Sequence, residues 1–210
     1  MGSRMLGVKV ARIPLAVTLF VAFCYLATAS CTAQQLDAAA VARGRAENGV
    51  VHAANEVLDA LQTRDGNRLA SLVHPEKGVR FSPSAYVDIE TDRVLSPDQV
   101  KRFWTDHSTY VWGYADGTGD PINLTPEQYL REYVLSRDFR QPSSINVNDD
   151  RASGNTNNNA ATIYPVGTRV EYYIQPSVRD SVEQHNWAAL RLVFERIGGS
   201  WFLVGVIHDQ

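Results

Sequence analysis

The C-terminal stretch Asn186–Gln210, NWAALRLVFERIGGSWFLVGVIHDQ, decides which fold the rest of the chain can adopt. Two apolar runs flank Gly198 and Gly199, and a glycine pair takes the two positive φ angles that a type I′ hairpin turn requires. The stretch therefore predicts a long β-hairpin. Because apolar residues fall on both faces of its strands, we expect the hairpin inside a sheet rather than at an edge.

A two-residue loop also predicts the register of this hairpin, with Leu192 opposite Gly205. In that register Arg191 and His208 lie one residue pair apart on a face that mixes aliphatic and ionisable side chains. An imidazole beside a guanidinium tends to stay neutral at pH 7, so the pair is a candidate ligand site. The alternative is a partly solvated face on which Arg191 pairs with Glu195 along the same strand.

Helices are expected mainly in the first third of the chain. Residues 34–62 are rich in alanine, and the glycines at 44 and 49 divide them into a looser tether and a more regular second half. Helical spacing there predicts one buried stripe, formed by Val50, Ala54, Val57, Leu58 and Leu61. A short second helix that contains Leu69, Leu72 and Val73 is expected to end at His74-Pro75. Ser96-Pro97 and Thr125-Pro126 predict two more helix starts.

Short runs of strand-forming residues occupy the remainder of the chain. They are Val79–Ser82, Tyr86–Ile89, Tyr110–Tyr114, Ile145–Val147, Thr162–Tyr164 and Thr168–Ile174. The polar, asparagine-rich segment Gln141–Ala161 predicts a long loop around the fourth run. The fold class expected is α+β, with N-terminal helices packed on a curved, mainly antiparallel sheet that ends in the long C-terminal hairpin.

This arrangement resembles the cone-shaped roll of the ketosteroid isomerase and nuclear transport factor type. The sequence also resembles a family of bacterial envelope lipoproteins, over about Val57–Gln210. The motifs that carry this resemblance are VHPEKGVRFS at 73–82, WGY with DG at 112–117, LTP at 124–126, LRLVFE at 190–195 and VIHDQ at 206–210. The resemblance implies a cell-envelope location and a single domain, and it supplies no catalytic residues.

The N-terminus has the pattern of an export signal. A basic segment with Arg4, Lys9 and Arg12 precedes the apolar run Ile13–Ala27, and small residues lead to Cys31. We expect a signal peptide over 1–30, a flexible tether over 31–49 and a single α+β domain over 50–210. Lipidation at Cys31 would anchor the chain in the membrane of the bacterial envelope. The alternative is ordinary cleavage after the AxA segment at 27–29, which would release a soluble periplasmic or secreted protein.

Charge and composition exclude several classes of protein. Removal of the signal leaves 17 Lys and Arg against 23 Asp and Glu, a net charge of −6, and no basic patch of the kind that binds nucleic acid. Five scattered histidines predict no zinc site, and no cofactor motif occurs. Asp116, Thr118 and Asp120 lack the remaining ligands of a known calcium loop, so we expect a turn there.

The candidate ligand-binding residues are Arg191 and His208 on the hairpin, with Tyr86 and Asp88 on a strand expected beside it. His74 follows a helix and is expected to cap its carbonyl groups. No activated nucleophile or acid–base dyad is evident, so catalytic residues are left unassigned. The sequence favours a non-catalytic envelope lipoprotein that binds a small ligand or a partner protein. A cone-fold isomerase, dehydratase or hydrolase is the alternative.

Overall fold

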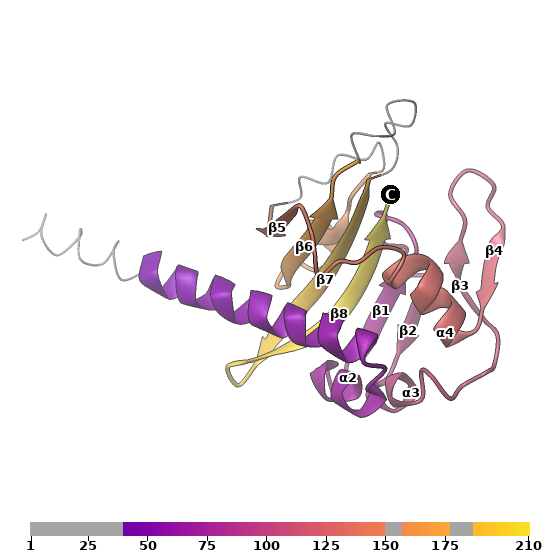
Figure 1. Cartoon of the computed structure of the whole chain (residues 1–210), viewed down its shortest axis with the longest axis horizontal. Helices are drawn as coiled ribbons and strands as arrows, with labels where there is room; N and C mark the ends of the chain where they lie inside the picture. The colour runs from indigo at the N-terminus through magenta and orange to yellow at the C-terminus, as the bar shows by residue number, and fades with distance from the viewer. Residues whose placement is uncertain (1–39, 150–156, 177–186) are drawn as a thin grey trace, which may run out of the picture. The chain divides into compact units, whose positions relative to one another are not determined.

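The predicted C-terminal hairpin is present, and it consists of β7 (Ala188–Ile197) and β8 (Ser200–Asp209). The computed structural model describes residues 40–149, 157–176 and 187–210 (Figure 1). Gly198 and Gly199 have φ angles of 56° and 95°, as the glycine pair predicts for the turn. The chain divides into two compact units, Met1–Ala46 and Glu47–Gln210, and the hairpin belongs to the second.

The hairpin occupies the middle of a six-stranded sheet with the order β2-β1-β8-β7-β6-β5. Its other strands are β1 (Val79–Ser82), β2 (Arg93–Leu95), β5 (Ser144–Val147) and β6 (Thr168–Ile174). Only β1 and β8 run parallel among the described strand pairs of this sheet. A separate two-stranded sheet pairs β3 (Tyr110–Tyr114) with β4 (Pro121–Leu124). The prediction of a mainly antiparallel sheet with a central hairpin is confirmed.

Helices precede the sheet and connect its strands, which confirms the α+β class. A helix covers residues 40–62, so the second half of the expected tether is helical. The others are α2 (Gly66–Leu72), α3 (Pro97–Lys101), α4 (Pro126–Tyr129) and α5 (Ala160–Ile163). Capping boxes at Ser96 and Thr125 begin α3 and α4 as predicted. Among the described helices, none is long and apolar enough to cross a membrane.

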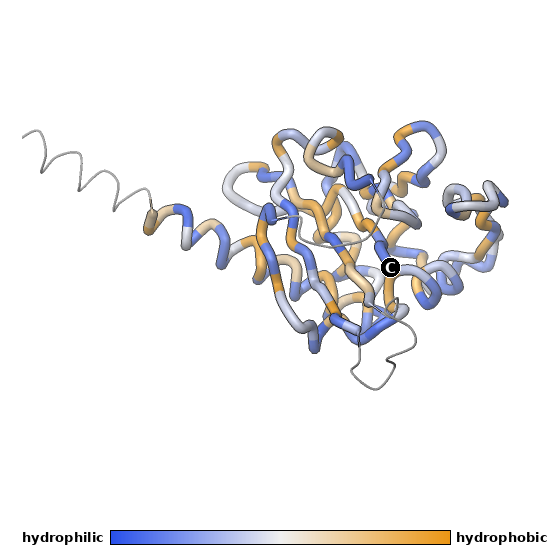
Figure 2. Tube along the Cα trace, turned by 90° about the horizontal axis from the view of Figure 1, so that it is seen from above, coloured by the Kyte–Doolittle hydropathy of each residue, from blue (hydrophilic) through white to orange (hydrophobic). Residues whose placement is uncertain are grey.

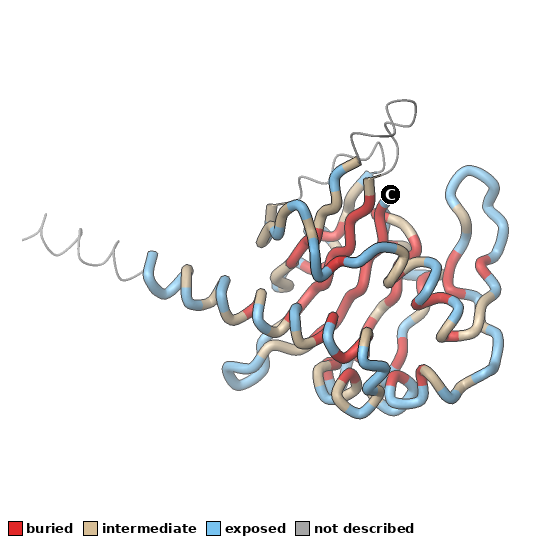
Figure 3. The backbone as a smooth tube through the Cα atoms, in the orientation of Figure 1, coloured by how far each residue is buried: buried red, intermediate tan, exposed pale blue. Residues whose placement is uncertain are grey.

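The main core lies between one face of the large sheet and the helices. Leu190, Leu192 and Phe194 of β7 pack there with the predicted stripe of the first helix. The hydroxyl of Tyr172 on β6 donates a hydrogen bond to Asn55 Oδ1 at 2.8 Å and ties the sheet to that helix. Apolar residues follow the strands in Figure 2, and buried residues follow the same strands in Figure 3. This burial on one face fixes the register of the central strands.

A smaller apolar cluster covers part of the opposite face. Val193, Val204 and Ile207 of the hairpin pack there against Val87, Ala160 and Tyr164, residues of two connecting segments. Asn159 clamps the first of these segments to the second. Its Oδ1 accepts a hydrogen bond from the backbone N–H of Val87 at 2.8 Å, and its Nδ2 donates to the Val87 carbonyl at 3.0 Å. Both faces of β8 are therefore buried along much of its length.

The register of the hairpin differs from the predicted one beyond the fourth residue pair from the turn. Phe194 lies opposite Leu203, but Val193 lies opposite Gly205, so Val204 is an extra residue in β8. This β-bulge reverses the faces of the later β8 residues relative to β7. The predicted pairing of Leu192 with Gly205 is wrong, because Leu192 lies opposite Val206.

Two of the predicted strands are absent from the described structure. Residues 162 and 163 belong to α5, and Tyr164 follows this helix as a cap that buries its ring. Residues 86–88 form an irregular segment that leads into a turn. Its backbone groups bond to the side chains of Asn159 and Asp92 instead of to a neighbouring strand. Side-chain hydrogen bonds to the backbone therefore replace the expected sheet pairing.

Candidate functional site

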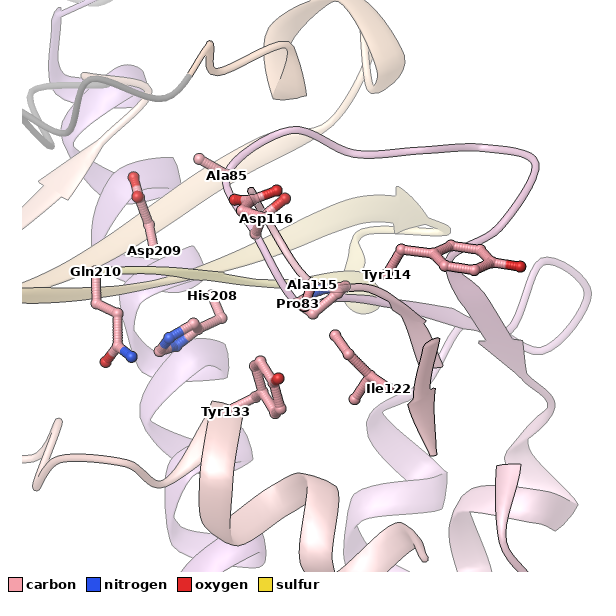
Figure 4. Close-up of a pocket in the computed structure, with 11 residues that line it drawn as sticks. Pro83, Ala85, Tyr114, Ala115, Asp116, Ile122, Tyr133, His208, Asp209 and Gln210 are labelled. Carbon is pink, nitrogen blue, oxygen red and sulfur yellow. The ribbon is translucent and has the colours of Figure 1, made fainter. Parts of the chain in front are cut away.

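A pocket of about 210 Å³ opens at the C-terminal end of β8 (Figure 4). The end of β8, the β3–β4 hairpin, η1 (Leu130–Val134, a turn of π-helix) and the segment after β1 surround it. The lining residues are Pro83, Ser84, Ala85, Tyr114, Ala115, Asp116, Ile122, Tyr133, His208, Asp209 and Gln210. The pocket thus depends on four segments, and the end of β8 is distant from the other three in the sequence.

His208 is a buried ionisable residue of this lining, and its side chain lies on the face of the sheet that packs against the main core. Only 3% of the residue is exposed, and its ring meets the ring of Tyr133 edge to face at 5.5 Å. Burial lowers the pKa of His208 to about 4, although the carbonyl of Tyr133 and the side chain of Gln210 oppose this shift. Neither ring nitrogen makes a hydrogen bond of normal geometry in the described structure. A neutral imidazole with unused hydrogen-bonding capacity therefore faces the pocket.

An aromatic stack forms the floor behind Tyr133. The rings of Tyr133 and Tyr129 stack with centroids 5.0 Å apart, and Tyr129 stacks on Trp112 at 4.1 Å. The Trp112 indole donates a hydrogen bond to the Leu124 carbonyl at 2.9 Å, which fixes the innermost ring. Phe81 meets both Trp112 and Tyr129 edge to face. These rings fill the space between sheet and helices, so the pocket is a shallow one with a rigid floor.

A second hollow of about 380 Å³ adjoins the first and shares Pro83, Ser84, Tyr114, Ala115 and Asp116 with it. Its further lining includes Tyr86, Asp88 and Asp92, together with the tip of the β3–β4 hairpin. Tyr86 and Tyr114 are each about half exposed there. The two hollows adjoin along the segment that follows β1, and we call them together the 83–92 groove.

Arg80 and Asp92 hold the wall of this groove in place. The Arg80 guanidinium donates hydrogen bonds to the carbonyl groups of Ile89 and Asp92 at 3.1 and 3.0 Å. One Asp92 carboxylate oxygen accepts the backbone N–H of Asp88 at 3.0 Å. Burial raises the pKa of Asp92 to about 6, despite these hydrogen bonds and the charge of Arg80. A carboxyl group with a pKa near neutrality lies in the groove and could exchange a proton.

A buried ion triad lies on the other side of β8. Arg191 is fully buried, and its guanidinium donates to Glu171 Oε2 and to Asp209 Oδ2 at 2.7 Å each. Burial raises the pKa of Asp209, and the guanidinium partly offsets this effect. Glu195 pairs instead with Lys77, whose Nζ lies 2.6 Å from Glu195 Oε2. The predicted ion pair between Arg191 and Glu195 is therefore wrong.

The structure does not bring the four predicted site residues together as expected. Because of the bulge, Arg191 and His208 lie on opposite faces of the sheet, and Figure 4 shows His208 and Asp209 pointing to opposite sides of β8. Arg191 lines neither hollow. His208 lines the pocket, whereas Tyr86 and Asp88 line the adjoining hollow. Three of the four residues thus belong to the 83–92 groove.

Sequence reasoning did not assign Tyr133, Asp92 or Gln210 to a site, and it considered Asp116 only as a calcium ligand. Tyr133 follows the predicted helix start at Thr125, and nothing in the sequence indicates that its ring meets His208. Within the described residues, no group of three or more His, Cys, Asp or Glu side chains is placed to hold a metal ion. His74 accepts hydrogen bonds through Nδ1 from the backbone N–H groups of Glu76 and Lys77, so it does not cap helix carbonyls as expected.

Comparisons with known proteins add the following. No protein-family model and no curated protein matches the sequence. Among solved structures, a Xanthomonas campestris chain named for the calcium/calmodulin-dependent protein kinase II association domain has 14% identity and a TM-score of 0.32, over 76% of this chain and 84% of that one. A nuclear transport factor 2-like protein of unknown function from Shewanella oneidensis has 9% identity and a TM-score of 0.32, over 78% and 98%. At these values neither similarity identifies a family or an activity for this chain.

Proposed function

We propose that this chain is a non-catalytic, lipid-anchored protein of the bacterial cell envelope whose α+β domain binds a small ligand in the 83–92 groove. The observation that carries the ligand site is His208. Its buried ring is neutral at pH 7, has no hydrogen-bond partner of normal geometry, and lines a pocket beside an aromatic floor. A buried polar group without a partner costs stability, so a ligand that bonds to it gains affinity.

The envelope location rests on the sequence of residues 1–31, which lies outside the described structure. A basic segment, an apolar run and Cys31 follow one another as they do in exported lipoproteins. A lipid anchor would hold the domain at a membrane surface and leave the groove open to solutes of the envelope. A partner protein remains the other class of ligand, and the burial of the His208 ring in the pocket lining favours a small molecule, which can reach a group that a protein surface cannot.

The test is retention of a co-purified molecule by the mature protein and by His208→Gln, measured by native mass spectrometry alongside thermal unfolding. We expect the wild type to retain a molecule of defined mass and the variant to lose it. Stability should change little, because the ring of His208 makes no hydrogen bond of normal geometry that the substitution would break. His107→Gln is the matched control, since His107 is exposed and lies outside both hollows. The contrary outcome has two parts: the wild type retains no molecule, and the variant unfolds at a temperature several degrees lower. That outcome would assign His208 a purely structural role.

The second candidate is an enzyme that uses the 83–92 groove for acid–base chemistry. The observation in its favour is Asp92, a buried carboxyl group whose pKa of about 6 suits proton transfer near neutral pH. The two functions differ in what happens to the retained molecule. A binding protein returns it with unchanged mass after prolonged incubation. An enzyme converts it, and Asp92→Asn would abolish the conversion without preventing binding.

A further inference from the structure

The two sides of β8 offer different groups to a ligand in the pocket at the end of this strand. Figure 4 shows His208, Gln210 and Tyr133 on one side. Asp209 and Asp116 lie on the other side. The rings of His208 and Tyr133 meet edge to face at 5.5 Å, so these two side chains form one wall. A ligand that reaches the buried ring of His208 therefore lies on the Tyr133 side of β8.

Hydrogen-bond acceptors lie beside the His208 ring. Burial lowers the pKa of His208 to about 4 and outweighs the opposing effects of the Tyr133 backbone and the Gln210 side chain, which both favour the protonated ring. A neutral imidazole has one N–H group, so it can donate to only one of these acceptors. Neither contact has normal hydrogen-bond geometry, although only 3% of the residue is exposed. The ring nitrogen without a hydrogen therefore keeps a buried lone pair that lacks a donor.

Charges of both signs act on this wall. Burial is the main cause of the lowered pKa of His208, and the positive charge of Arg137 acts in the same direction. Burial is also the main cause of the raised pKa of Tyr133, to which the negative charges of Glu132 and Asp116 add. A cation is attracted by the carboxylates but repelled by the guanidinium, and the reverse holds for an anion. Neither gains enough to offset the hydration that it loses on entry, so the pocket favours an uncharged ligand.

The rest of the lining limits the size of the ligand. The pocket volume of about 210 Å³ corresponds to that of about seven water molecules in the liquid. Pro83, Ala115 and Ile122 supply apolar lining in addition to the ring of Tyr133. The pocket therefore suits a compact molecule with an apolar body and one hydrogen-bond donor.

We propose that this pocket binds a small, uncharged alcohol, whose hydroxyl group donates a hydrogen bond to the unprotonated ring nitrogen of His208 and whose apolar body packs on Tyr133 and Ile122. A hydroxyl group matches this nitrogen because it supplies the missing donor without a charge. This inference rests on the proposed ligand-binding function and specifies the chemical class of the ligand.

Four probes with the same six-membered ring test the proposal: cyclohexanol, fluorocyclohexane, protonated cyclohexylamine and cyclohexanecarboxylate. Fluorine replaces the hydroxyl group at nearly equal size but donates no hydrogen bond. Binding is followed through the ring resonances of Tyr133 in NMR titrations of the mature protein at pH 7. We expect cyclohexanol to bind with a Kd about fivefold lower than that of fluorocyclohexane, the factor that one neutral hydrogen bond contributes. Both charged probes should bind more weakly than cyclohexanol.

His208→Phe keeps an aromatic ring but removes both nitrogen atoms. It should raise the Kd of cyclohexanol to about that of fluorocyclohexane and leave the Kd of fluorocyclohexane nearly unchanged. His107→Phe is the matched control and should change neither value, because His107 is exposed and lies outside both hollows. The comparison of probes in the wild type does not depend on the folding of either variant.

Equal binding of cyclohexanol and fluorocyclohexane would overturn the alcohol inference and leave a small-ligand site in place. Tighter binding of either charged probe would overturn the preference for an uncharged ligand. A preference for the alcohol that persists in His208→Phe would overturn the placement of the hydroxyl group beside His208. If no probe binds, the alcohol inference fails, and retention of a co-purified molecule decides the proposed function separately.

Discussion

Two buried residues at the 83–92 groove respond to pH in opposite senses. The pKa of Asp92 is raised to about 6, so the folded protein takes up a proton between pH 6 and pH 4 that the unfolded chain does not. Its contribution to stability therefore grows as the pH falls. The pKa of His208 is lowered to about 4, so between pH 6.5 and pH 4 the unfolded chain binds the extra proton and stability falls with the pH. The two contributions therefore oppose each other between pH 6 and pH 4.

Replacing Asp92 by asparagine should show how much the charge of Asp92 changes the free energy of unfolding. At pH 7.5 the ionised Asp92 opposes folding, and Asp92→Asn keeps an acceptor for the Asp88 N–H without the charge. We expect Asp92→Asn to raise the free energy of unfolding by about 1–2 kcal/mol at pH 7.5, after allowance for partial solvation. The gain should shrink towards zero at pH 4.5, where the carboxyl group is itself protonated. Chemical denaturation of both proteins at the two pH values measures this difference.

Asp120→Asn in the exposed β3–β4 turn serves as the control and should change stability little at either pH. A gain of equal size at pH 7.5 and pH 4.5 would show that it arises from packing and not from the charge of Asp92. Residues that serve a function often lower the stability of the folded protein. A destabilising charge at Asp92 is consistent with proton exchange between Asp92 and a ligand.

At the scale of elements, local sequence signals predict the hairpin, its turn and its central place in the sheet. Glycine pairs, capping hydroxyls and prolines at the first helical position act within a few residues, so the turn and the starts of α3 and α4 follow from the sequence. The bulge at Val204 does not follow, because valine is an ordinary strand residue and does not mark a bulge in the sequence. One inserted residue was enough to place Arg191 and His208 on opposite faces.

Gly205 lies directly after the bulge, where a side chain would meet its neighbours too closely. A side chain at this position would point at Tyr164, with the added Cβ 2.9 Å from the Tyr164 hydroxyl and 3.1 Å from Val193 Cγ2. We expect Gly205→Val to lower the free energy of unfolding by about 1–3 kcal/mol through overpacking. Thermal and urea unfolding give this value, and an unchanged midpoint would mean that the ring of Tyr164 moves aside freely.

A double variant locates the clash. The Tyr164 hydroxyl is buried without a hydrogen-bond partner of normal geometry in the described structure, so Tyr164→Phe alone should cost little. In the Gly205→Ala background, Tyr164→Phe removes the nearest atom and should restore part of the lost stability. Additive effects of the two substitutions would place the clash elsewhere, at Val193 or in the backbone.

At the scale of the whole molecule, the candidate site depends on contacts that no local pattern reports. The pocket forms where the end of β8 meets η1 and the β3–β4 hairpin, and β8 is far from the other two in the chain. Their amphipathic spacing predicts that they are buried but not which neighbour they meet. The sequence identified three residues of the groove, His208, Tyr86 and Asp88, from the chemistry of their side chains. It grouped Arg191 with them because of the predicted hairpin register, which the bulge changes.

Attachment of the molecule to a membrane would depend on Cys31. Cys31 is the cysteine to which the export signal points, and acyl chains on it would add roughly 0.8 kcal/mol of membrane affinity for each buried methylene group. We expect the wild type in the membrane fraction of a bacterial host and Cys31→Ser in the soluble envelope fraction, with mass spectrometry showing lipid on Cys31 as the first residue. Cys24→Ser is the matched control, since Cys24 lies inside the apolar run and its loss should leave the anchor intact. A soluble wild type that begins at Ser30 would show cleavage after Ala29 by an ordinary signal peptidase, and the domain would then diffuse freely and carry its ligand instead of holding it at the membrane.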